Sequence, residues 1–325
     1  MKKLVIIDFM YLMYRHFSYI KNKEKQQDNK PTLTNPNTGE ESARLYFTIK
    51  DIETILQNHT DADVVVCADR PSLRKQLEIE ETTTYKANRA GHLDELDIKA
   101  IDNTLNLLKQ AGISTVYKDG FEADDLIYSI VYTYEENYDQ IIIYTPDSDL
   151  AILIDDTVSL MRYKAVYSRY GLSGKSKHAN LLAAHAQITK SNYQDYFSVE
   201  FSNSATVEID YNAIMLYKVT VGDKSDNIKG IKGFGNAAYM RLRNSLIKDG
   251  HLFALKNCNC GFNTRTFLET ICRHYLTPAQ IEQALTCLEY VKPYYTAIDP
   301  SVLRQPENLD YRKQVYLTTW GIAKI

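Results

Sequence analysis

Five carboxylates of this chain gather around one predicted helix and one predicted strand, and they are the side chains best suited to chemistry. Glu122, Asp124 and Asp125 come just before an apolar run with helical spacing. Asp147 and Asp149 follow a short apolar strand. Carboxylates that face one another repel, which raises their pKa values unless a cation lies between them. This stretch therefore either leaves its acids in solvent or uses them to hold a metal ion.

Asp8, Asp69 and Asp147 each follow a short apolar run that predicts a buried strand. Helical segments separate the three strands, which is the pattern of a parallel sheet with crossover helices. In open sheets of this kind, ligands bind outside the carboxyl ends of the strands. We therefore expect these three aspartates and Asp149 to converge at one edge of the sheet. Glu122, Asp124 and Asp125 would join them from the start of the neighbouring helix.

A second set of acids, Asp223 and Asp226, follows a further predicted helix at a spacing that lets both side chains share a direction. Any single aspartate is weak evidence, because Asp is also common at helix starts and in turns. Acids at the ends of three separate strands, all at one edge of the sheet, are harder to explain as helix caps and turn residues. Since all the expected ligands are oxygen atoms, the sequence predicts a site for Mg²⁺ or Mn²⁺ rather than for zinc.

A glycine-rich segment comes directly after this second set of acids. Gly230, Gly233 and Gly235 allow a tight turn whose backbone faces a ligand, and a helix restarts at Asn236, where its first amides could receive a phosphate. Alone, such a turn is weak evidence, because many helix pairs need glycine. The segment is also basic, with Lys224, Lys229 and Lys232. Together with the paired aspartates, it predicts a helix-turn-helix clamp on a nucleic-acid backbone.

A second basic segment surrounds Tyr85 and includes Arg70, Lys86 and Arg89. Standing alone, a charge run with an aromatic residue is typical of a solvated surface. Residues 161–205 raise the same question, because their lysines, arginines and tyrosines would suit either a polyanion or solvent.

The overall composition limits the function classes. The 325 residues are 44% hydrophobic and 24% charged, as in a soluble globular protein. The net charge of -3 does not indicate a nucleic-acid-binding protein, so that hypothesis depends on local patches. No apolar run approaches the roughly 20 residues of a membrane span, and the scattered cysteines favour free thiols in a reducing compartment. We therefore expect a cytoplasmic protein, located in the host cytoplasm if it is viral.

Six motifs in a fixed order resemble the 5′ nucleases, the family of flap endonucleases and of the 5′–3′ exonuclease domains of bacterial DNA polymerases. They are IIDF, CADRPSLRK, TTTYKANR, FEADDL, YTPDSDLAIL and VGDKSDNIKGIKGFG. Each motif is short, but six in the family's order are specific, and they span roughly the first three quarters of the chain. The compact chain and residues 287–303 resemble most the ribonuclease H type of T-even bacteriophages.

The resemblance implies an α/β fold. We expect a Rossmann-like, PIN-type, mostly parallel sheet with helices on both faces, followed by a helical region with a helix-three-turn-helix motif. The catalytic nuclease domain would occupy residues 1–205, with an arch near residues 70–95. The helical, duplex-binding region would occupy residues 206–325.

The resemblance also implies two Mg²⁺ sites, in which Mn²⁺ could substitute, and a K⁺ ion at the glycine turn. The metal ligands would be Asp8, Asp69, Glu122, Asp124, Asp125, Asp147, Asp149, Asp223 and Asp226. Lys86 and Arg89 would act in catalysis by supplying positive charge at the scissile phosphate. Tyr85 would stack on a terminal base. The remaining nucleic-acid contacts would come from Arg70, Lys224, Lys229, Gly230, Lys232, Gly233 and Gly235.

The implied activity is Mg²⁺-dependent hydrolysis of phosphodiesters near the 5′ end of DNA, or of RNA in RNA:DNA hybrids, for primer removal in replication or for repair. DNA with 5′ ends or flaps would be the substrate, replication proteins such as a single-strand-binding protein would be partners, and the protein would be a monomer without membrane contact. Two alternatives stay open. The predicted duplex clamp speaks against a PIN-type ribonuclease acting on RNA, and the complete set of acids speaks against a non-catalytic nucleic-acid-binding protein on the same fold.

Overall fold

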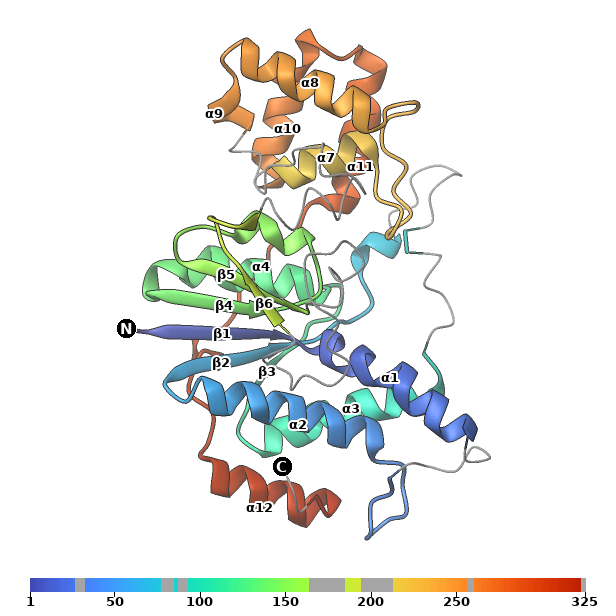
Figure 1. Cartoon of the computed structure of the whole chain (residues 1–325), viewed down its shortest axis with the longest axis vertical. Coiled ribbons are helices and arrows are strands. Elements are labelled where there is room, and N and C mark those ends of the chain that lie inside the picture. The colour runs from blue at the N-terminus through green and yellow to red at the C-terminus, as the bar shows by residue number, and fades with distance from the viewer. Residues whose placement is uncertain are drawn as a thin grey trace.

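The computed structural model describes residues 1–26, 33–76, 85–86, 93–163, 185–193, 213–255 and 260–322. Among these residues, the centre is a six-stranded sheet in the order β3-β2-β1-β4-β5-β6 (Figure 1). All neighbouring strands are parallel except β5 and β6. The strands are β1 (Lys3–Asp8), β2 (Ala62–Cys67), β3 (Ser114–Val116), β4 (Gln140–Tyr144), β5 (Val158–Tyr163) and β6 (His185–Ile188). The predicted α/β fold with a mostly parallel sheet is confirmed.

Two apolar layers cover the sheet. Leu4 and Ile6 of β1 face the layer that contains α4 (Ala123–Tyr134), whereas Val5 and Ile7 face the opposite layer. The opposite layer is built with α1 (Phe9–Gln26), α2 (Ala43–Asn58) and α3 (Glu95–Gln110). Because both faces of the central strands are covered, their sequences are continuous apolar runs rather than alternating ones.

Short capping motifs set the starts of the helices around the site. At the start of α4, Asp125 accepts the backbone N–H of Glu122 at 3.1 Å. Asp94 and Asp97 form a reciprocal capping box at the start of α3. The helix α11 (Pro278–Val291) begins after Thr277 with proline as its first residue, a position that suits proline because the first helical N–H has no partner within the helix.

Five further helices lie above the α4 face of the sheet (Figure 1). In the described part of the chain they are α7 (Ile214–Val221), α8 (Asn236–Lys248), α9 (Leu252–Leu255), α10 (Gly261–Thr270) and α11. Their buried side chains join those of α4 and the sheet in one continuous apolar cluster. Every residue of α7 from Ile214 to Thr220 is buried, which fits a helix at the centre of this contact. None of the helices that the structure describes is both long and apolar enough to cross a membrane.

The last helix, α12 (Leu309–Trp320), leaves the helical region and packs near α3 on the opposite side of the sheet (Figure 1). The Arg312 guanidinium donates to the Glu53 carboxylate of α2 at 2.6 and 2.7 Å, and Tyr316 donates to the same carboxylate at 2.7 Å. All three side chains are buried. The domain boundary expected after residue 205 lies outside the described residues and stays a prediction. The helix α12 belongs to the sequence range expected to be the helical region, and in the structure it packs on the sheet unit.

Candidate active site

Four aspartates meet at the carboxyl edge of the sheet. Asp8 is the last residue of β1, Asp69 and Asp147 follow β2 and β4, and Asp124 lies in the first turn of α4. Together they line a hollow of about 620 Å³, which Lys86 also lines. The convergence follows from the topology, because β2, β1 and β4 are adjacent and parallel. We call Asp8, Asp69, Asp124 and Asp147 the first acid group.

Hydrogen bonds fix the directions of these carboxylates. Asp8 accepts from the Thr145 hydroxyl at 3.0 Å and from the Tyr11 backbone N–H at 3.3 Å. Asp69 accepts from the Ala123 backbone N–H at 2.6 Å. Each carboxylate keeps further lone pairs that can bind a cation. The first acid group is therefore positioned by the fold before any ligand binds.

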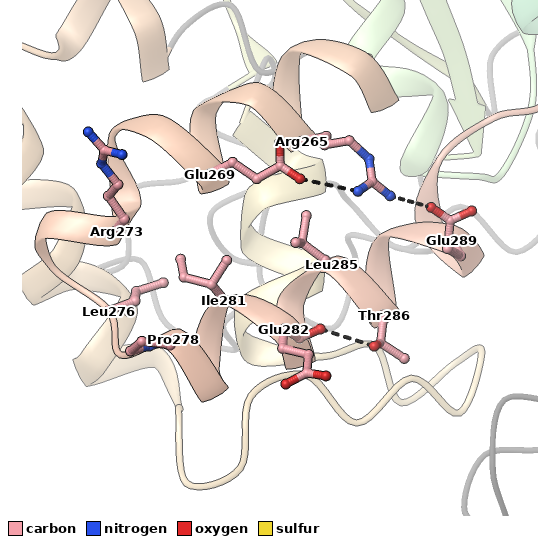
Figure 2. A pocket seen from close by; sticks show the side chains of 10 residues that line it. All are labelled: Arg265, Glu269, Arg273, Leu276, Pro278, Ile281, Glu282, Leu285, Thr286 and Glu289. Carbon is pink, nitrogen blue, oxygen red and sulfur yellow. Dashed lines mark hydrogen bonds and ion pairs between the residues drawn. The ribbon is translucent and has the colours of Figure 1, made fainter.

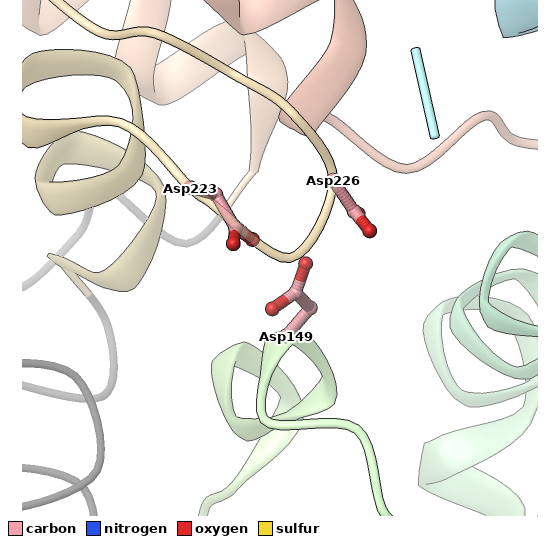
Figure 3. A group of neighbouring side chains, drawn as sticks. All are labelled: Asp149, Asp223 and Asp226. Atoms are coloured by element: carbon pink, nitrogen blue, oxygen red, sulfur yellow. The ribbon is translucent and has the colours of Figure 1, made fainter. Parts of the chain in front are cut away.

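Asp149, Asp223 and Asp226 form the second acid group. One carboxylate oxygen from each lies within 4.8 Å of the others, and the three side chains lie near one another, with Asp149 on one segment and Asp223 and Asp226 on the loop that faces it (Figure 3). Asp149 begins the short helix η4 (Asp149–Leu153), whereas Asp223 and Asp226 come from the loop after α7. The second acid group therefore joins the sheet unit to the helical region.

Lys218, which the sequence motifs did not reveal, is bound to the second acid group. Its side chain extends from the apolar helix α7 and is only 5% exposed. The Nζ atom donates to Asp149 and, at 2.5 Å, to Asp223. A lysine inside an otherwise apolar helix was the available signal, because a buried ammonium requires a charged partner.

The two acid groups differ in their electrostatics. Burial and neighbouring aspartates raise the pKa of Asp8 to about 7. Burial opposes ionisation of Asp223 too, but the Lys218 ammonium outweighs it and lowers the pKa of Asp223 to about 2. Burial and neighbouring aspartates still raise the pKa of Asp149 to about 8. In both acid groups, therefore, at least one buried carboxylate has too little positive charge beside it to ionise at its ordinary pKa.

Both acid groups fit hard divalent cations. All their ligand atoms are carboxylate oxygens, the donor type that Mg²⁺ and Mn²⁺ prefer. A divalent cation would also stabilise the charged carboxylates and reverse the upward pKa shifts of Asp8 and Asp149. Charge and ligand chemistry thus agree on the same type of occupant.

Asp125, predicted as a metal ligand, serves the fold instead. Its two oxygens accept from the Arg74 guanidinium at 2.6 and 2.8 Å. They also accept the backbone N–H groups of Glu122 at 3.1 Å and of Tyr294 at 2.7 Å. Adjacent residues of a helical turn point in different directions, so Asp124 faces the hollow while Asp125 is fully buried. The role of Asp125 as a metal ligand stays a prediction, although protein donors already occupy both of its oxygens.

Glu122 has its carboxylate engaged by three donors from the protein. Oε2 accepts from Arg74 at 3.1 Å and from the Tyr85 hydroxyl at 2.9 Å, and Oε1 accepts from Lys86 at 2.8 Å. Burial opposes its ionisation, but Lys86 and Arg74 prevail and lower its pKa. Glu122 thus holds Lys86 at the rim of the first acid group. Its role as a metal ligand stays a prediction.

The structure does not bring two other predicted residues to an open binding position. Tyr85 is buried, and its ring stacks on Tyr290 with the centroids 5.8 Å apart, so the ring is not open to a base. The Arg70 guanidinium lies 4.2 Å from the centre of the Tyr117 ring and 3.7 Å from the Asp102 carboxylate, and Arg70 lines neither hollow beside the acid groups. Arg89 lies outside the described residues.

The helix α1 adds a polar wall that the motifs did not indicate. Tyr14, Arg15 and His16 line the same hollow as the first acid group. Asp51 of α2 accepts from Arg15 at 2.6 Å and lies 2.7 Å from His16 Nε2. The sequence pattern could not reveal the contacts of Asp51 with Arg15 and His16, because Asp51 is 35 or more residues away from them in the chain.

The glycine turn between α7 and α8 forms as predicted. Gly230 and Gly233 have φ angles of 68° and 76°, and Gly235 is the N-cap of α8. A Cβ atom at Gly230 would lie 2.4 Å from the backbone nitrogen of Gly222, so only glycine fits without moving the backbone. The loop exposes Lys224, Lys229 and Lys232. A hollow of about 1050 Å³ runs from this loop to the second acid group.

A separate hollow of about 600 Å³ lies between α10 and α11 (Figure 2). Its apolar lining includes Leu276, Ile281 and Leu285, and Arg265 pairs with Glu289 at its rim at 2.8 Å. No residue of either acid group lines this hollow.

The parallel sheet, its acidic edge and the glycine turn define a metal-binding α/β protein of the nuclease class, and comparison with known proteins gives the family. The family model described as 5′-3′ exonuclease, N-terminal resolvase-like domain, matches residues 3–180. The chain belongs to this family of nucleases.

Relatives agree with this assignment. The 5′-3′ exonuclease of Buchnera aphidicola subsp. Schizaphis graminum is 25% identical over 238 residues, which are 72% of this chain and 67% of that protein. DNA polymerase I of Caldicellulosiruptor bescii is 28% identical over 240 residues, which are 74% of this chain but only 24% of that protein. A similar solved structure is that of the bacteriophage T5 flap endonuclease, a pseudo-enzyme–product complex with DNA and metal ions. It matches with a TM-score of 0.51 and 17% sequence identity, and the match covers 89% of this chain and 99% of the T5 chain. At that identity the likeness shows the fold alone.

Proposed function

We propose that this chain is a Mg²⁺-dependent 5′–3′ exonuclease and flap endonuclease that hydrolyses phosphodiesters near the 5′ ends of DNA. The observation that carries the proposal is the convergence of two acid groups in adjoining hollows, which share Pro146 and Asp147. Membership of the 5′-3′ exonuclease family supports it. The T5 flap endonuclease, a protein of similar fold solved with DNA and metal ions, supports the substrate class.

The glycine turn would hold the duplex. Lys224 and Lys229 are exposed along the hollow that leads to the second acid group, where they would neutralise backbone phosphates. Gly235 lets a backbone approach the first turn of α8, where the positive end of the helix dipole attracts a phosphate. A strand that follows this path would reach Asp149 and then the first acid group. The K⁺ ion expected at the turn would add to the same phosphate contact.

The acids would hold the metal and the basic residues would hold the substrate. Asp8, Asp69, Asp124 and Asp147 would bind one divalent cation, and Asp149, Asp223 and Asp226 the other. When bound, such a pair of cations activates a water molecule and stabilises the leaving oxygen of a phosphodiester. Lys86, fixed by Glu122 at 2.8 Å, would offer its charge to the phosphate as negative charge develops there. Arg89 would have the same role, and Arg15 and His16 of the α1 wall would contact the nucleotide in the hollow.

We extend the proposal to RNA in RNA:DNA hybrids. Contacts to phosphates carry no direct sequence information, so a clamp built on lysines and backbone amides would accept either backbone. Primer removal during replication, or repair, in the cytoplasm would then be the biological task, with a single-strand-binding protein as a partner and Mn²⁺ as an alternative cation. The chain would act as a monomer with a nuclease domain near residues 1–205.

A cleavage assay tests this function. The full chain is incubated with a 5′-labelled flap, a nicked duplex, an RNA:DNA hybrid and single-stranded RNA, in Mg²⁺, Mn²⁺ or EDTA. We expect cleavage near the 5′ end with either metal and none in EDTA. Asp147→Asn should bind the flap and fail to cleave it, whereas Asp155→Asn, an acid of the same segment outside both groups, should cleave normally.

Three results would contradict the proposal. If Asp147→Asn cleaves the flap at the rate of the unchanged chain, Asp147 is not a ligand of a catalytic metal ion. Preferred cleavage of single-stranded RNA would favour a PIN-type ribonuclease. Tight binding of the flap without cleavage in any metal would favour a non-catalytic binding protein.

A further inference from the structure

Lys218 takes the position that a cation would need in the second acid group. Its Nζ atom bridges Asp149 and Asp223, and oxygens of these two residues, with one of Asp226, are the potential metal ligands within 4.8 Å of one another. Because the side chain is 5% exposed, water screens this contact only weakly. A divalent cation on the same oxygens would lie within a few ångströms of the ammonium and would be repelled by it.

We propose that Lys218 is a counter-cation for the second acid group, which the second divalent cation must displace and which then binds a phosphate of the nucleic acid. The inference rests on the proposed function, because it assumes that both acid groups bind metal. It assigns to Lys218 the regulation of metal binding: the second cation binds weakly to the free protein and tightly once a backbone phosphate receives the displaced ammonium.

The surroundings give the displaced ammonium a place to go. Lys218 lines the hollow that leads from the second acid group to Lys224 and Lys229, the path proposed for the phosphate backbone. A lysine side chain is flexible enough to turn from a carboxylate to a phosphate without moving its helix. Metal and nucleic acid would therefore each favour the binding of the other, because such coupling is reciprocal.

Among the described residues, no ammonium donates a hydrogen bond to a carboxylate of the first acid group. Lys86, which lines the same hollow, donates to Glu122 at 2.8 Å, and the carboxylate of Glu122 belongs to neither acid group. A cation can therefore reach Asp8, Asp69, Asp124 and Asp147 without first breaking an ion pair within the group. The two groups should differ in affinity for the same metal, even though both consist of aspartates.

Mn²⁺ binding measured without substrate tests the inference. Free Mn²⁺ is followed by electron paramagnetic resonance during titration of the full chain, first alone and then with an uncleavable duplex that carries phosphorothioate linkages. We expect one tight site and a second at least tenfold weaker, which tightens when the duplex is present. Lys218→Met should tighten the weaker site at least tenfold without duplex and remove most of the duplex effect.

Two control variants accompany this measurement. Lys218→Arg keeps the charge and should preserve the weak second site. Lys248→Met removes an exposed lysine in the last turn of α8 that lines neither hollow, and it should leave the second site unchanged. A weaker site that Lys218→Met does not tighten would overturn the inference. If the unchanged chain binds no Mn²⁺ at all, the proposed function itself fails. That outcome differs from one in which two sites bind Mn²⁺ with affinities that do not depend on Lys218.

Thermal unfolding covers the case in which Lys218→Met folds poorly. Without Lys218 the second acid group has lost its counter-cation, so this variant should melt lower than the unchanged chain in EDTA and regain most of the difference in Mn²⁺. A variant that folds only with Mn²⁺ would support the inference in the same way. An equal loss of melting temperature with and without Mn²⁺ would overturn it.

Discussion

The two acid groups place carboxylates together by different means. The first acid group is built on adjacent parallel strands and the start of α4, and hydrogen bonds from Thr145 and Ala123 fix two of its acids. The second spans two parts of the molecule and contains a buried lysine. One group is thus formed by the sheet, while the other is assembled by contact between η4 and the loop after α7 and is paired with a lysine. Under the proposed function, the first acid group would be a permanent metal site and the second a conditional one.

The largest difference between the groups should appear in catalysis. Asp8→Asn removes a ligand of the permanent site and should lower the rate of flap cleavage by about a thousandfold or more, in the range seen when a main transition-state contact is lost. Asp223→Asn should cost less, about tenfold to a hundredfold, because Asp149 and Asp226 remain. Single-turnover cleavage in Mg²⁺ measures both. An equal loss in the two variants would remove the distinction between the groups.

Arg74 should affect stability rather than metal binding. Its guanidinium holds Asp125, Glu122 and the Lys292 carbonyl, and its side chain is buried. Breaking such a buried pair from one side costs about 3–5 kcal/mol, so Arg74→Met should lower the free energy of unfolding by about that amount. Urea unfolding measures the change.

The control for this variant is Arg70→Met, which removes a partly exposed arginine and should cost about 1 kcal/mol or less. Mg²⁺ should not restore the stability that Arg74→Met loses, since Asp125 is not a metal ligand in this account. Restoration by Mg²⁺ would return Asp125 to the metal site.

Lys86 should matter for rate more than for binding. Because Glu122 holds its ammonium at the rim of the first acid group, Lys86→Ala should slow single-turnover cleavage by about a hundredfold. The affinity for the flap, measured by fluorescence anisotropy in Ca²⁺, should change by only about threefold, the effect of a single phosphate contact among several. Equal losses in rate and affinity would make Lys86 a docking residue.

The smallest expected effect concerns an acid pair outside both groups. Glu135, at the far end of α4, shares a hydrogen bond with Asp155, and this bond together with burial raises the pKa of Glu135 to about 8. Its folded pKa is therefore above its ordinary value of 4.5, so the contribution of the protonated form to stability is complete below pH 4.5 and is lost as the pH rises through 8.

Glu135→Gln mimics the protonated form and should stabilise the protein at pH 9 but not at pH 4. Because Glu135 is partly exposed, the gain should be small, about 2 °C in melting temperature. Melting curves in EDTA at several pH values check it. A gain of the same size at pH 4 would show that the pair does not share a proton.

The sequence was sufficient for the sheet and for the first acid group. Apolar runs that end at Asp8 and Asp69, with helices between them, imply parallel strands whose ends coincide, and the structure has this arrangement. The glycine turn was also predictable, because Gly230 and Gly233 occupy positions with positive φ. These features depend on local patterns that a single chain displays.

Contacts between distant segments were not predictable in this way. Asp124 and Asp125 look alike in the sequence, and only the position of Arg74 separates a candidate ligand from a structural residue. Tyr85 is an aromatic residue in a basic segment, which is why the sequence predicts stacking on a base. In the structure its ring stacks instead on Tyr290, which lies more than 200 positions later in the chain. Lys218 has one partner, Asp223, five positions away, but its contact with Asp149, 69 positions away, could not be read from a local pattern.

The most direct test is a crystal of the full chain soaked in Mn²⁺, measured at an X-ray wavelength where manganese scatters anomalously. We predict two anomalous peaks: a strong one among Asp8, Asp69, Asp124 and Asp147, and a weaker one beside Asp149, Asp223 and Asp226 with Lys218 turned away. Peaks elsewhere, or none at the first acid group, would contradict the account that these carboxylates form the metal centre of a nuclease.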